Sequence, residues 1–94
     1  MARLSDSEID ERLAVRQGWR RGEGSSIVCD RSFADFAAAI AFVDRVAELA
    51  EAANHHPDIL LHGWNKVRLT LSTHSEGGLT DADFALAGQI DELV

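Results

Sequence analysis

Pro57 is the only proline among the 94 residues, and it interrupts the longest helical pattern of the chain. The apolar residues of that pattern recur at alternating steps of four and three: Phe36, Ile40, Val43, Ala47 and Ala50. They predict an amphipathic helix over residues 34–53. Because proline disfavours the α conformation of the residue before it, this helix has to end at or before His56. Two adjacent histidines, His55 and His56, therefore lie just beyond the end of a helix.

A third histidine, His74, adds to this pair of imidazoles. Histidine has an ordinary pKa close to neutrality, so clustered histidines indicate proton transfer or metal binding. A zinc site needs three or four converging ligands, whereas His55 and His56, as neighbours in an extended segment, point to opposite sides. We therefore expect proton transfer and no metal. Two loop histidines and an unrelated one at a strand end would give the same spacing, and this alternative stays open.

Three helix starts show a hydroxyl residue followed three positions later by an acid, which is the pattern of a capping box. The three pairs are Ser5 with Glu8, Ser32 with Asp35, and Thr80 with Asp83. They predict a first helix over residues 6–15, the start of the helix that ends before the histidine pair, and a last helix over residues 81–94.

The remaining segments are typical of strands. Residues 18–30 hold two short strand-like pieces around the turn Gly22-Glu23-Gly24, which predicts a hairpin. Residues 66–73 alternate between apolar and polar side chains, as expected for a strand with one buried face. His74 would continue the polar face if this strand persisted, and Gly77-Gly78 predicts a turn before the last helix.

The predicted order of elements is helix, two strands, helix, two strands, helix. Strands joined by short turns favour an antiparallel sheet, so we expect an α+β fold in which helices pack on one face of that sheet. The chain shows no long linker and no internal repeat, and residues 1–94 are expected to form a single domain.

Composition and charge exclude several classes of partner. The net charge of −7 disfavours a nucleic-acid binder, which needs a basic face, and equally a protein that docks on anionic membranes. No apolar run approaches the roughly 20 residues of a membrane span, and the polar N-terminal segment does not resemble a signal peptide. The single cysteine, Cys29, excludes an intramolecular disulfide. We expect a cytoplasmic protein.

Two acids stand out against this background. Asp83 falls on the apolar stripe of the last helix, together with Ala87, Ile90 and Val94. One interpretation is an acid in the first turn that the helix dipole stabilises while it stays in contact with water. The other is a functional carboxylate. Glu51 precedes His55 by four residues, so one helical turn would bring the two side chains together. The alternative for Glu51 is an ordinary solvated acid at the helix edge.

An ordered set of these residues extends over most of the chain. It consists of Glu51-x-x-x-His55-His56-Pro57, then Trp64-Asn65-Lys66-Val67, then Thr73-His74-x-x-Gly77-Gly78-Leu79-Thr80-x-x-Asp83. This order resembles the pterin-4a-carbinolamine dehydratase family from about Trp19 to the C-terminus. The resemblance implies a four-stranded antiparallel sheet with three helices, which matches the predicted elements. One departure is that six residues separate Pro57 from Trp64, where the animal members have five, and tryptophan replaces their tyrosine.

The resemblance also implies an activity. It predicts a lyase, a dehydratase that removes water from 4a-hydroxytetrahydrobiopterin to give quinonoid dihydropterin. Such a reaction needs groups that deliver and accept protons near neutral pH, which suits histidine. No cofactor is implied, because a dehydration involves no redox change.

The resemblance assigns residues to this chemistry by their place in the motif. The implied catalytic residues are His55, His56 and His74. Glu51 and Asp83 would orient these histidines or stabilise their charged form. The remaining substrate-binding residues, expected to line the pterin site, are Asn54, Pro57, Ser72 and Thr73.

Two other functions stay open. Some animal members of the family also serve as a dimerisation cofactor for a homeodomain transcription factor, so a binding module is one alternative. A dehydratase for another pterin, such as a molybdopterin-related one, is the other. The expected partner is a small-molecule pterin, with no direct nucleic-acid contact and no membrane.

The chain is also expected to form a homodimer or a homotetramer. Phe36, Phe42 and Leu49 make the long helix apolar over more of its circumference than one sheet face needs. An open sheet leaves edge strands that small proteins commonly pair or cover. Most homo-oligomers close with two-fold symmetry, and the resemblance points to dimers or dimers of dimers.

Overall fold

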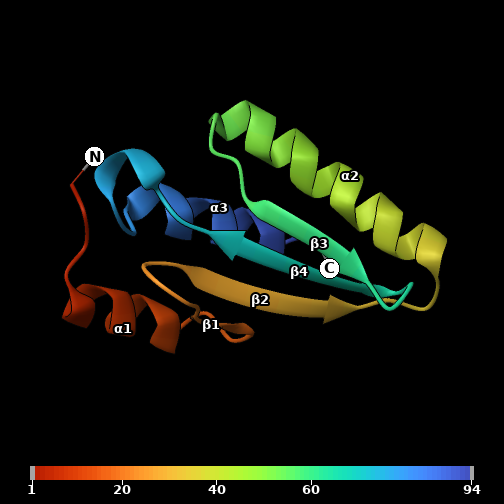
Figure 1. Ribbon diagram of the computed structural model, residues 1–94, viewed down its shortest axis with the longest axis horizontal. Helices are drawn as coiled ribbons and strands as arrows, with labels where there is room; N and C mark the ends of the chain where they lie inside the picture. Colours follow the sequence, from red (N-terminus) through yellow and green to blue (C-terminus); the bar gives the residue numbers. More distant parts are fainter. Residues whose placement is uncertain (1, 94) are drawn as a thin grey trace.

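The computed structural model describes residues 2–93 as a four-stranded antiparallel sheet with three α-helices (Figure 1). The helices are α1 (Asp6–Ala14), α2 (Phe36–Ala53) and α3 (Asp81–Asp91), and a short 3₁₀ helix is η1 (His74–Glu76). The strands are β1 (Trp19–Arg21), β2 (Ile27–Ser32), β3 (Asp58–His62) and β4 (Lys66–Leu71). Their order across the sheet is β1-β2-β4-β3. The predicted α+β fold is confirmed.

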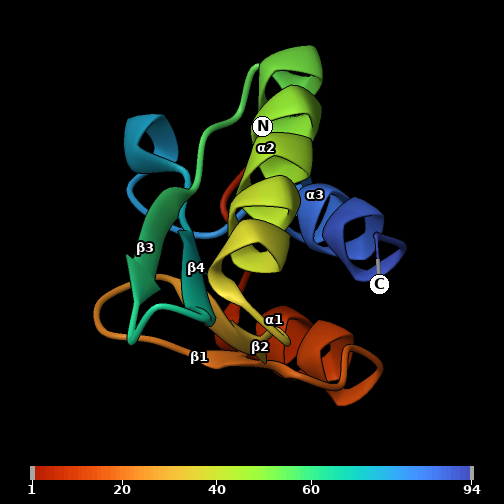
Figure 2. The same ribbon diagram turned by 90° about the vertical axis from the view of Figure 1, so that its right-hand side faces the viewer.

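The helices gather on one face of the sheet, as the view along the sheet shows (Figure 2). Antiparallel pairing places Cys29 of β2 opposite Leu69 of β4, and Ile27 opposite Leu71, so these side chains share a face. Their face meets Ile9 of α1 and buried residues of α2 and α3 in one apolar core. The placement of the helices on one face, predicted from the element order, is confirmed.

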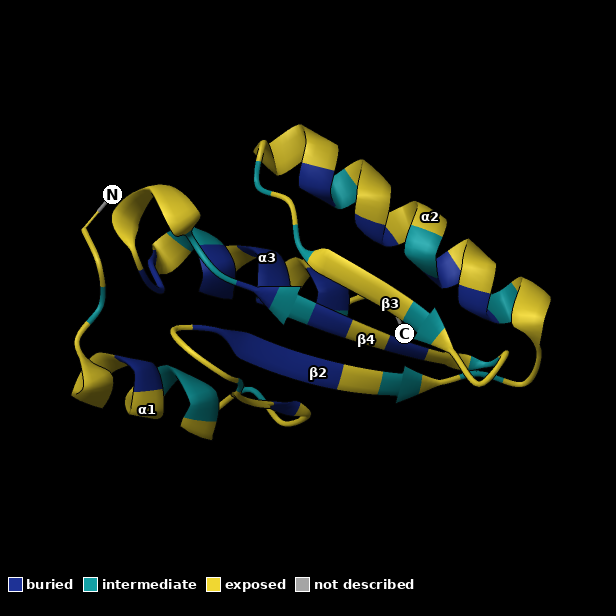
Figure 3. Cartoon of the chain, viewed as in Figure 1, coloured by how far each residue is buried: buried dark blue, intermediate teal, exposed yellow. Residues whose placement is uncertain are grey.

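β4 shows how the sequence pattern sets the register. Its inward residues Val67, Leu69 and Leu71 are fully buried, whereas Arg68 between them is exposed (Figure 3). Each fully buried side chain of this kind contributes about 1.5–3 kcal/mol from the transfer out of water. A shift of the pairing by one residue would expose all three, so the alternation specifies the register strongly.

α2 presents a different stripe to the core than the spacing predicted. The residues that are buried on this helix are Ala39, Phe42, Val46 and Ala50. Of the predicted stripe only Ala50 is buried, whereas Phe36 and Ile40 are 53% and 38% exposed. Apolar residues occur around most of this helix, so two neighbouring stripes fit a spacing of three and four. Packing against the other elements selects the buried one.

The helix starts are capped at two of the three predicted positions. The capping boxes of Ser5 with Glu8 and of Thr80 with Asp83 are both present. The third prediction was wrong, because Ser32 is the last residue of β2, and Asp35 is itself the N-cap of α2. The Asp35 carboxylate accepts the backbone N–H of Ala38 at 2.8 Å.

Several predicted boundaries shift slightly. β4 ends at Leu71 instead of residue 73, and α3 ends at Asp91 instead of residue 94. Val94, which the predicted stripe of the last helix included, lies outside the described residues. None of the helices within residues 2–93 is long and apolar enough to span a membrane.

Candidate active site

The end of α2 positions the histidine pair. Asn54 adopts the left-handed conformation, with φ of 50°, and its backbone N–H donates to the carbonyls of Ala50 and Glu51. Asparagine tolerates this conformation better than most residues, which suits it to end a helix. The chain then leaves the helix before Pro57, as predicted, and the two imidazoles point to different surroundings. The side chain of His55 is 14% exposed and that of His56 is 57% exposed.

His55 is bonded to Asp83, a contact between two elements far apart in the sequence. Nε2 of His55 lies 2.6 Å from Oδ1 of Asp83. Asp83 stands in the first turn of α3 and is 0% exposed. The contact joins the C-terminal end of α2 to the N-terminal end of α3, which lie close together at one end of the sheet (Figure 1). Asp83 is therefore not an acid in contact with water.

The second oxygen of Asp83 is held by two donors. The backbone N–H of Thr80 donates to Oδ2 at 3.0 Å, which forms half of the capping box. The hydroxyl of Thr73 donates to the same oxygen at 2.7 Å. Buried carboxylates are found where hydrogen bonds replace water, and here both oxygens are satisfied.

His56 is bonded to Glu51, which corrects the pairing predicted from the sequence. Nε2 of His56 meets Oε2 of Glu51, whereas His55 meets Asp83. The prediction assumed that the helix continued to His55, so that a step of four would bring it beside Glu51. Because α2 ends at Ala53 and Asn54 turns the chain, His55 faces α3 instead.

His74 lies apart from the predicted strand. It is exposed and begins η1, so it does not continue the polar face of β4. Gly77 ends this 3₁₀ helix with φ of 72°, and an isolated bridge pairs Thr73 with Gly78. This bridge closes the His74 segment into a loop directly before Thr80 and α3.

A hollow of about 380 Å³ opens beside His74. Ser72 and His74 line it together with Asp58, which follows Pro57, and with residues 23–26 of the β1–β2 turn. The hydroxyl of Ser72 donates to the carbonyl of Ser25 at 2.9 Å and thereby holds that turn against the end of β4. Polar groups in a concave site can fix the orientation of a small polar ligand.

The structure thus groups the predicted site residues in three sets. His55, Asp83 and Thr73 form a buried cluster, His56 and Glu51 form an exposed pair, and Ser72 and His74 line the hollow. Asn54 is exposed and its visible role is to end α2, while Pro57 leads into β3.

Two residues of this region were missed from the sequence. Asp58 carried no signal beyond its place next to Pro57. Thr80 was recognised as a helix cap but not as a site residue, although its pairing with Asp83 in the capping box was a sufficient signal. Its hydroxyl lies 3.0 Å from that of Thr73.

Trp64 of the sequence motif lies away from the histidines. The six residues between Pro57 and Trp64 form β3 and Gly63, and they run to the far end of the sheet (Figure 1). Trp64 is exposed there and has φ of 60°. The spacing that departs from the animal members therefore belongs to a segment that leads away from His55.

Cys29 has no features of a nucleophile. It is fully buried in β2, and burial raises the pKa of its thiol to about 11. A thiol reacts as its thiolate, which is scarce at neutral pH when the pKa is raised in this way. Within residues 2–93, no three side chains of the types His, Cys, Asp and Glu are arranged to hold a metal ion.

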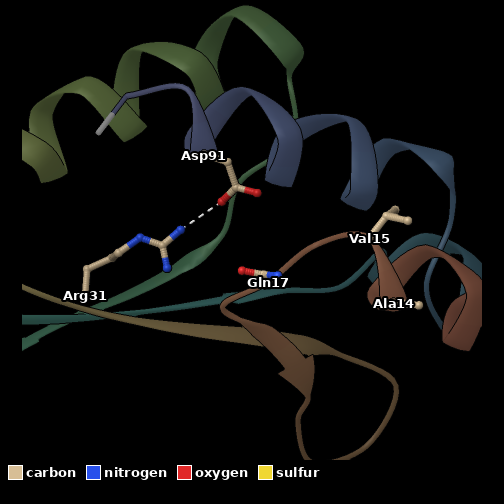
Figure 4. Close-up of a pocket in the computed structure, with 5 residues that line it drawn as sticks. All are labelled: Ala14, Val15, Gln17, Arg31 and Asp91. Carbon is tan, nitrogen blue, oxygen red and sulfur yellow. Dashed lines mark hydrogen bonds and ion pairs between the residues drawn. The ribbon is translucent and has the colours of Figure 1, made fainter.

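A second hollow lies beside the end of α1 and contains none of the predicted site residues. It is lined by Ala14, Val15, Gln17, Arg31 and Asp91 (Figure 4). Nη2 of Arg31 and Nε1 of Trp19 donate to Oδ1 of Asp91 at 2.8 Å and 2.9 Å. These bonds satisfy the charged groups within the protein and tie α3 to the sheet, which indicates a structural role.

The chain is similar in sequence to known proteins along almost its whole length. The sequence profile of the family described as Pterin 4 alpha carbinolamine dehydratase matches residues 2–93. A relative from Chloroflexus aggregans is 55% identical over 94 residues, which cover 100% of this chain and 99% of the relative. It carries the provisional name pterin-4-alpha-carbinolamine dehydratase.

Two solved structures are also similar. A protein from Brucella melitensis, described as a transcriptional coactivator/pterin dehydratase, has a TM-score of 0.91 and 35% identity, with 97% of each chain covered. A pterin dehydratase-like protein, described as a RuBisCO assembly factor in the alpha-carboxysome, has a TM-score of 0.69 and 30% identity, with 82% of this chain and 89% of that one covered. The match along almost its whole length shows that this chain belongs to the pterin-4-alpha-carbinolamine dehydratase family.

Proposed function

We propose that this chain is an enzyme that removes water from 4a-hydroxytetrahydrobiopterin and gives quinonoid dihydropterin. The buried His55–Asp83 pair carries the proposal. Asp83 is 0% exposed and bonded at both oxygens, so it holds an imidazole in a fixed place beside the partly exposed end of α2. Three motif histidines in a chain of this family support the same chemistry.

The reaction requires two proton transfers and no electron acceptor. The C4a–O bond breaks with its electron pair going to oxygen, which takes up a proton and leaves as water. N5 loses its proton, and its electron pair forms the C4a=N5 double bond. One group has to give a proton and another has to take one, and His55, His56 and His74 are the proposed groups. Ser72, with Glu51, Asn54 and Pro57 at the end of α2, is proposed to contact the polar pterin. Thr73 is proposed to serve the site through its hydrogen bond to Asp83.

A direct assay tests this proposal. The purified protein is mixed with chemically generated 4a-hydroxytetrahydropterin, and the dihydropterin product is followed by absorbance against the uncatalysed rate. We expect acceleration that saturates with substrate. A rate equal to that of buffer would contradict the enzyme function and favour a binding module, as the descriptions of the two solved structures suggest. If only another pterin is dehydrated, the proposed substrate is wrong and the proposed reaction still holds.

We also propose that the protein associates with itself. Phe36 and Ile40 form an exposed apolar surface on α2, and the edge strand β3 exposes Ile59 and Leu60. Edge strands and exposed apolar surfaces are commonly covered in small proteins. Light scattering at micromolar concentration should give a multiple of the 10.3 kDa mass of one chain.

Two variants and a control locate the contact. Phe36→Asp should lower the mass if α2 forms the interface, and Leu60→Asp should lower it if β3 does. Val15→Asp places the same charge on another exposed apolar residue, near the end of α1, and should leave the mass unchanged. A wild-type mass of about one chain would rule out the association.

A further inference from the structure

We propose that Thr73, Thr80 and Asp83 form a hydrogen-bond chain with one direction, which fixes the ring proton of His55 on Nε2. The reacting proton is then exchanged at Nδ1. Thr73 and Thr80 are positioning residues in this scheme, because they act on His55 through Asp83. The catalytic consequence rests on the proposed function, whereas the position of the proton is a property of the protein alone.

The hydrogen-bond chain begins at a backbone N–H, which can only donate. The N–H of Ala82 donates to Oγ1 of Thr80 at 3.2 Å. Oγ1 of Thr80 lies 3.0 Å from Oγ1 of Thr73, and the Thr73 hydroxyl donates to Oδ2 of Asp83 at 2.7 Å. A hydroxyl has one proton to donate, and that of Thr73 is used on Asp83. The proton between the two threonines therefore comes from Thr80.

Asp83 passes this direction on to His55. Oδ2 receives two donors, the Thr73 hydroxyl and the Thr80 backbone N–H at 3.0 Å. Oδ1 lies 2.6 Å from Nε2 of His55. An ionised carboxylate can only accept hydrogen bonds, so Nε2 has to carry the proton. Asp83 is 0% exposed, and water does not compete for these bonds.

The consequence concerns the other ring nitrogen. With Nε2 bound to Asp83, Nδ1 is the atom of His55 that can take up or release a proton. The same logic operates wherever a buried carboxylate orients a catalytic imidazole, and a wrong tautomer there lowers the rate by several orders of magnitude. Here the hydrogen bonds of two threonines determine which oxygen of Asp83 faces the imidazole.

Asp83→Asn tests the chain directly. The Thr80 N–H and the Thr73 hydroxyl both need an acceptor, so the amide oxygen takes the place of Oδ2 and the amide NH₂ faces His55. Nε2 then has to accept, and the proton of the neutral ring moves to Nδ1. Long-range ¹H–¹⁵N correlation spectra of labelled protein show which nitrogen is protonated. We expect Nε2 in the wild type and Nδ1 in Asp83→Asn, with kcat lowered about 10²-fold or more.

Two results would overturn the hydrogen-bond chain. One is a wild-type His55 protonated on Nδ1, and the other is the same tautomer in Asp83→Asn as in the wild type. Glu51→Gln is the matched control, because it makes the same chemical change beside His56, and it should leave the tautomer of His55 unchanged. A change of the His55 tautomer in this control would also contradict the proposed hydrogen-bond chain.

Thr73 provides an independent test if Asp83→Asn does not fold. Thr73→Val keeps the shape and removes the hydroxyl, whereas Thr73→Ser keeps the hydroxyl. We expect kcat of the valine variant to fall about tenfold with little change in KM, and the serine variant to restore it. Equal kcat values for Thr73→Val and the wild type would overturn the role of Thr73.

The tautomer measurement separates this proposal from the proposed function. A protein with the expected tautomers and no dehydration of the pterin would retain the hydrogen-bond chain and refute the enzyme function. An active dehydratase with His55 protonated on Nδ1 would support the enzyme function and refute the hydrogen-bond chain.

Discussion

The two neighbouring histidines have opposite environments. His55 is paired with a carboxylate that is 0% exposed and bonded at both oxygens, whereas His56 is paired with Glu51, which is 76% exposed. They are adjacent in the sequence, and the backbone after α2 turns one side chain inward and the other outward. The same pair of chemical groups is thus placed once inside the protein and once at its surface.

This difference determines what each pair can do. A buried pair has a fixed geometry and cannot exchange its partner for water, so it suits the control of a tautomer. A surface pair competes with water and salt and contributes little to stability, but its imidazole is free to meet a substrate. The two histidines are therefore expected to contribute differently, His55 through a fixed ring proton and His56 through a ring that is freely accessible.

The largest difference between the pairs should appear in stability. Asp83→Ala leaves the His55 ring, the Thr73 hydroxyl and the Thr80 N–H without their acceptor in a buried place. Removal of one partner from a buried network lowers the free energy of unfolding by about 3–5 kcal/mol. Glu51→Ala should change it by less than about 0.5 kcal/mol, because both partners are exposed. Urea denaturation of both variants checks this, and similar losses would remove the distinction between the pairs.

Replacement of the exposed histidines should lower activity and leave stability almost unchanged. His56→Ala and His74→Ala are each expected to lower the dehydration rate by about 10²-fold or more, as for lost acid and base groups. Their free energies of unfolding should stay within about 0.5 kcal/mol of the wild type, since surface changes rarely exceed this. The double variant should lose less than the product of the two factors if the residues act as one unit. Rates near wild type in both single variants would contradict their catalytic role.

The sequence predicted the fold because its signals were local. Alternation along β4, the capping boxes of α1 and α3, and Pro57 after α2 each depend on residues within a few positions of one another. The buried face of α2 was mispredicted, because Phe36 and Phe42 are both apolar and only tertiary packing decides which is covered.

The pairing within the site could not be predicted in this way. His55 and Asp83 are 28 positions apart, and their contact depends on how α3 packs against α2. The sequence instead suggested Glu51 for His55, since a helix was assumed to continue through Asn54. A left-handed residue at the helix end redirects the chain, and asparagine gives only a weak signal for that conformation.

A smaller effect is expected when the exposed carboxylate is changed conservatively. Glu51→Gln keeps a hydrogen-bond acceptor near His56 but removes the charge. An exposed hydrogen bond contributes about 0.5–1.5 kcal/mol, so kcat should fall about twofold to tenfold. Steady-state kinetics of Glu51→Gln and Asp83→Asn checks the comparison, because kcat should fall much more in the variant of the buried carboxylate. A larger loss in Glu51→Gln than in Asp83→Asn would reverse the roles assigned to the two pairs.

The smallest effect is expected at Asp30, an exposed carboxylate outside the site that is also well paired. Arg68 donates from Nε to Oδ1 at 2.8 Å, and Arg20 lies 2.8 Å from Oδ2. The hydrogen bond from Arg68, with a smaller contribution from Arg20, lowers the pKa of Asp30 below its usual value. A lowered pKa stabilises the fold above the ordinary aspartate value of about 3.9, and this stabilisation is lost as the pH falls through the lowered pKa.

Asp30→Asn should therefore lower the free energy of unfolding at pH 7 by no more than about 0.5 kcal/mol, because solvent and salt screen the exposed pairs. The difference from the wild type should shrink as the pH falls through the lowered pKa of Asp30, because the wild-type carboxyl then becomes protonated itself. Urea denaturation of both proteins at pH 7, 5 and 3 measures it, and added salt should reduce the difference at pH 7. A loss above about 1 kcal/mol at pH 7, or one that does not shrink with falling pH, would show that an exposed, well-paired carboxylate can contribute as much as a buried one. Burial would then not explain the contrast with Asp83.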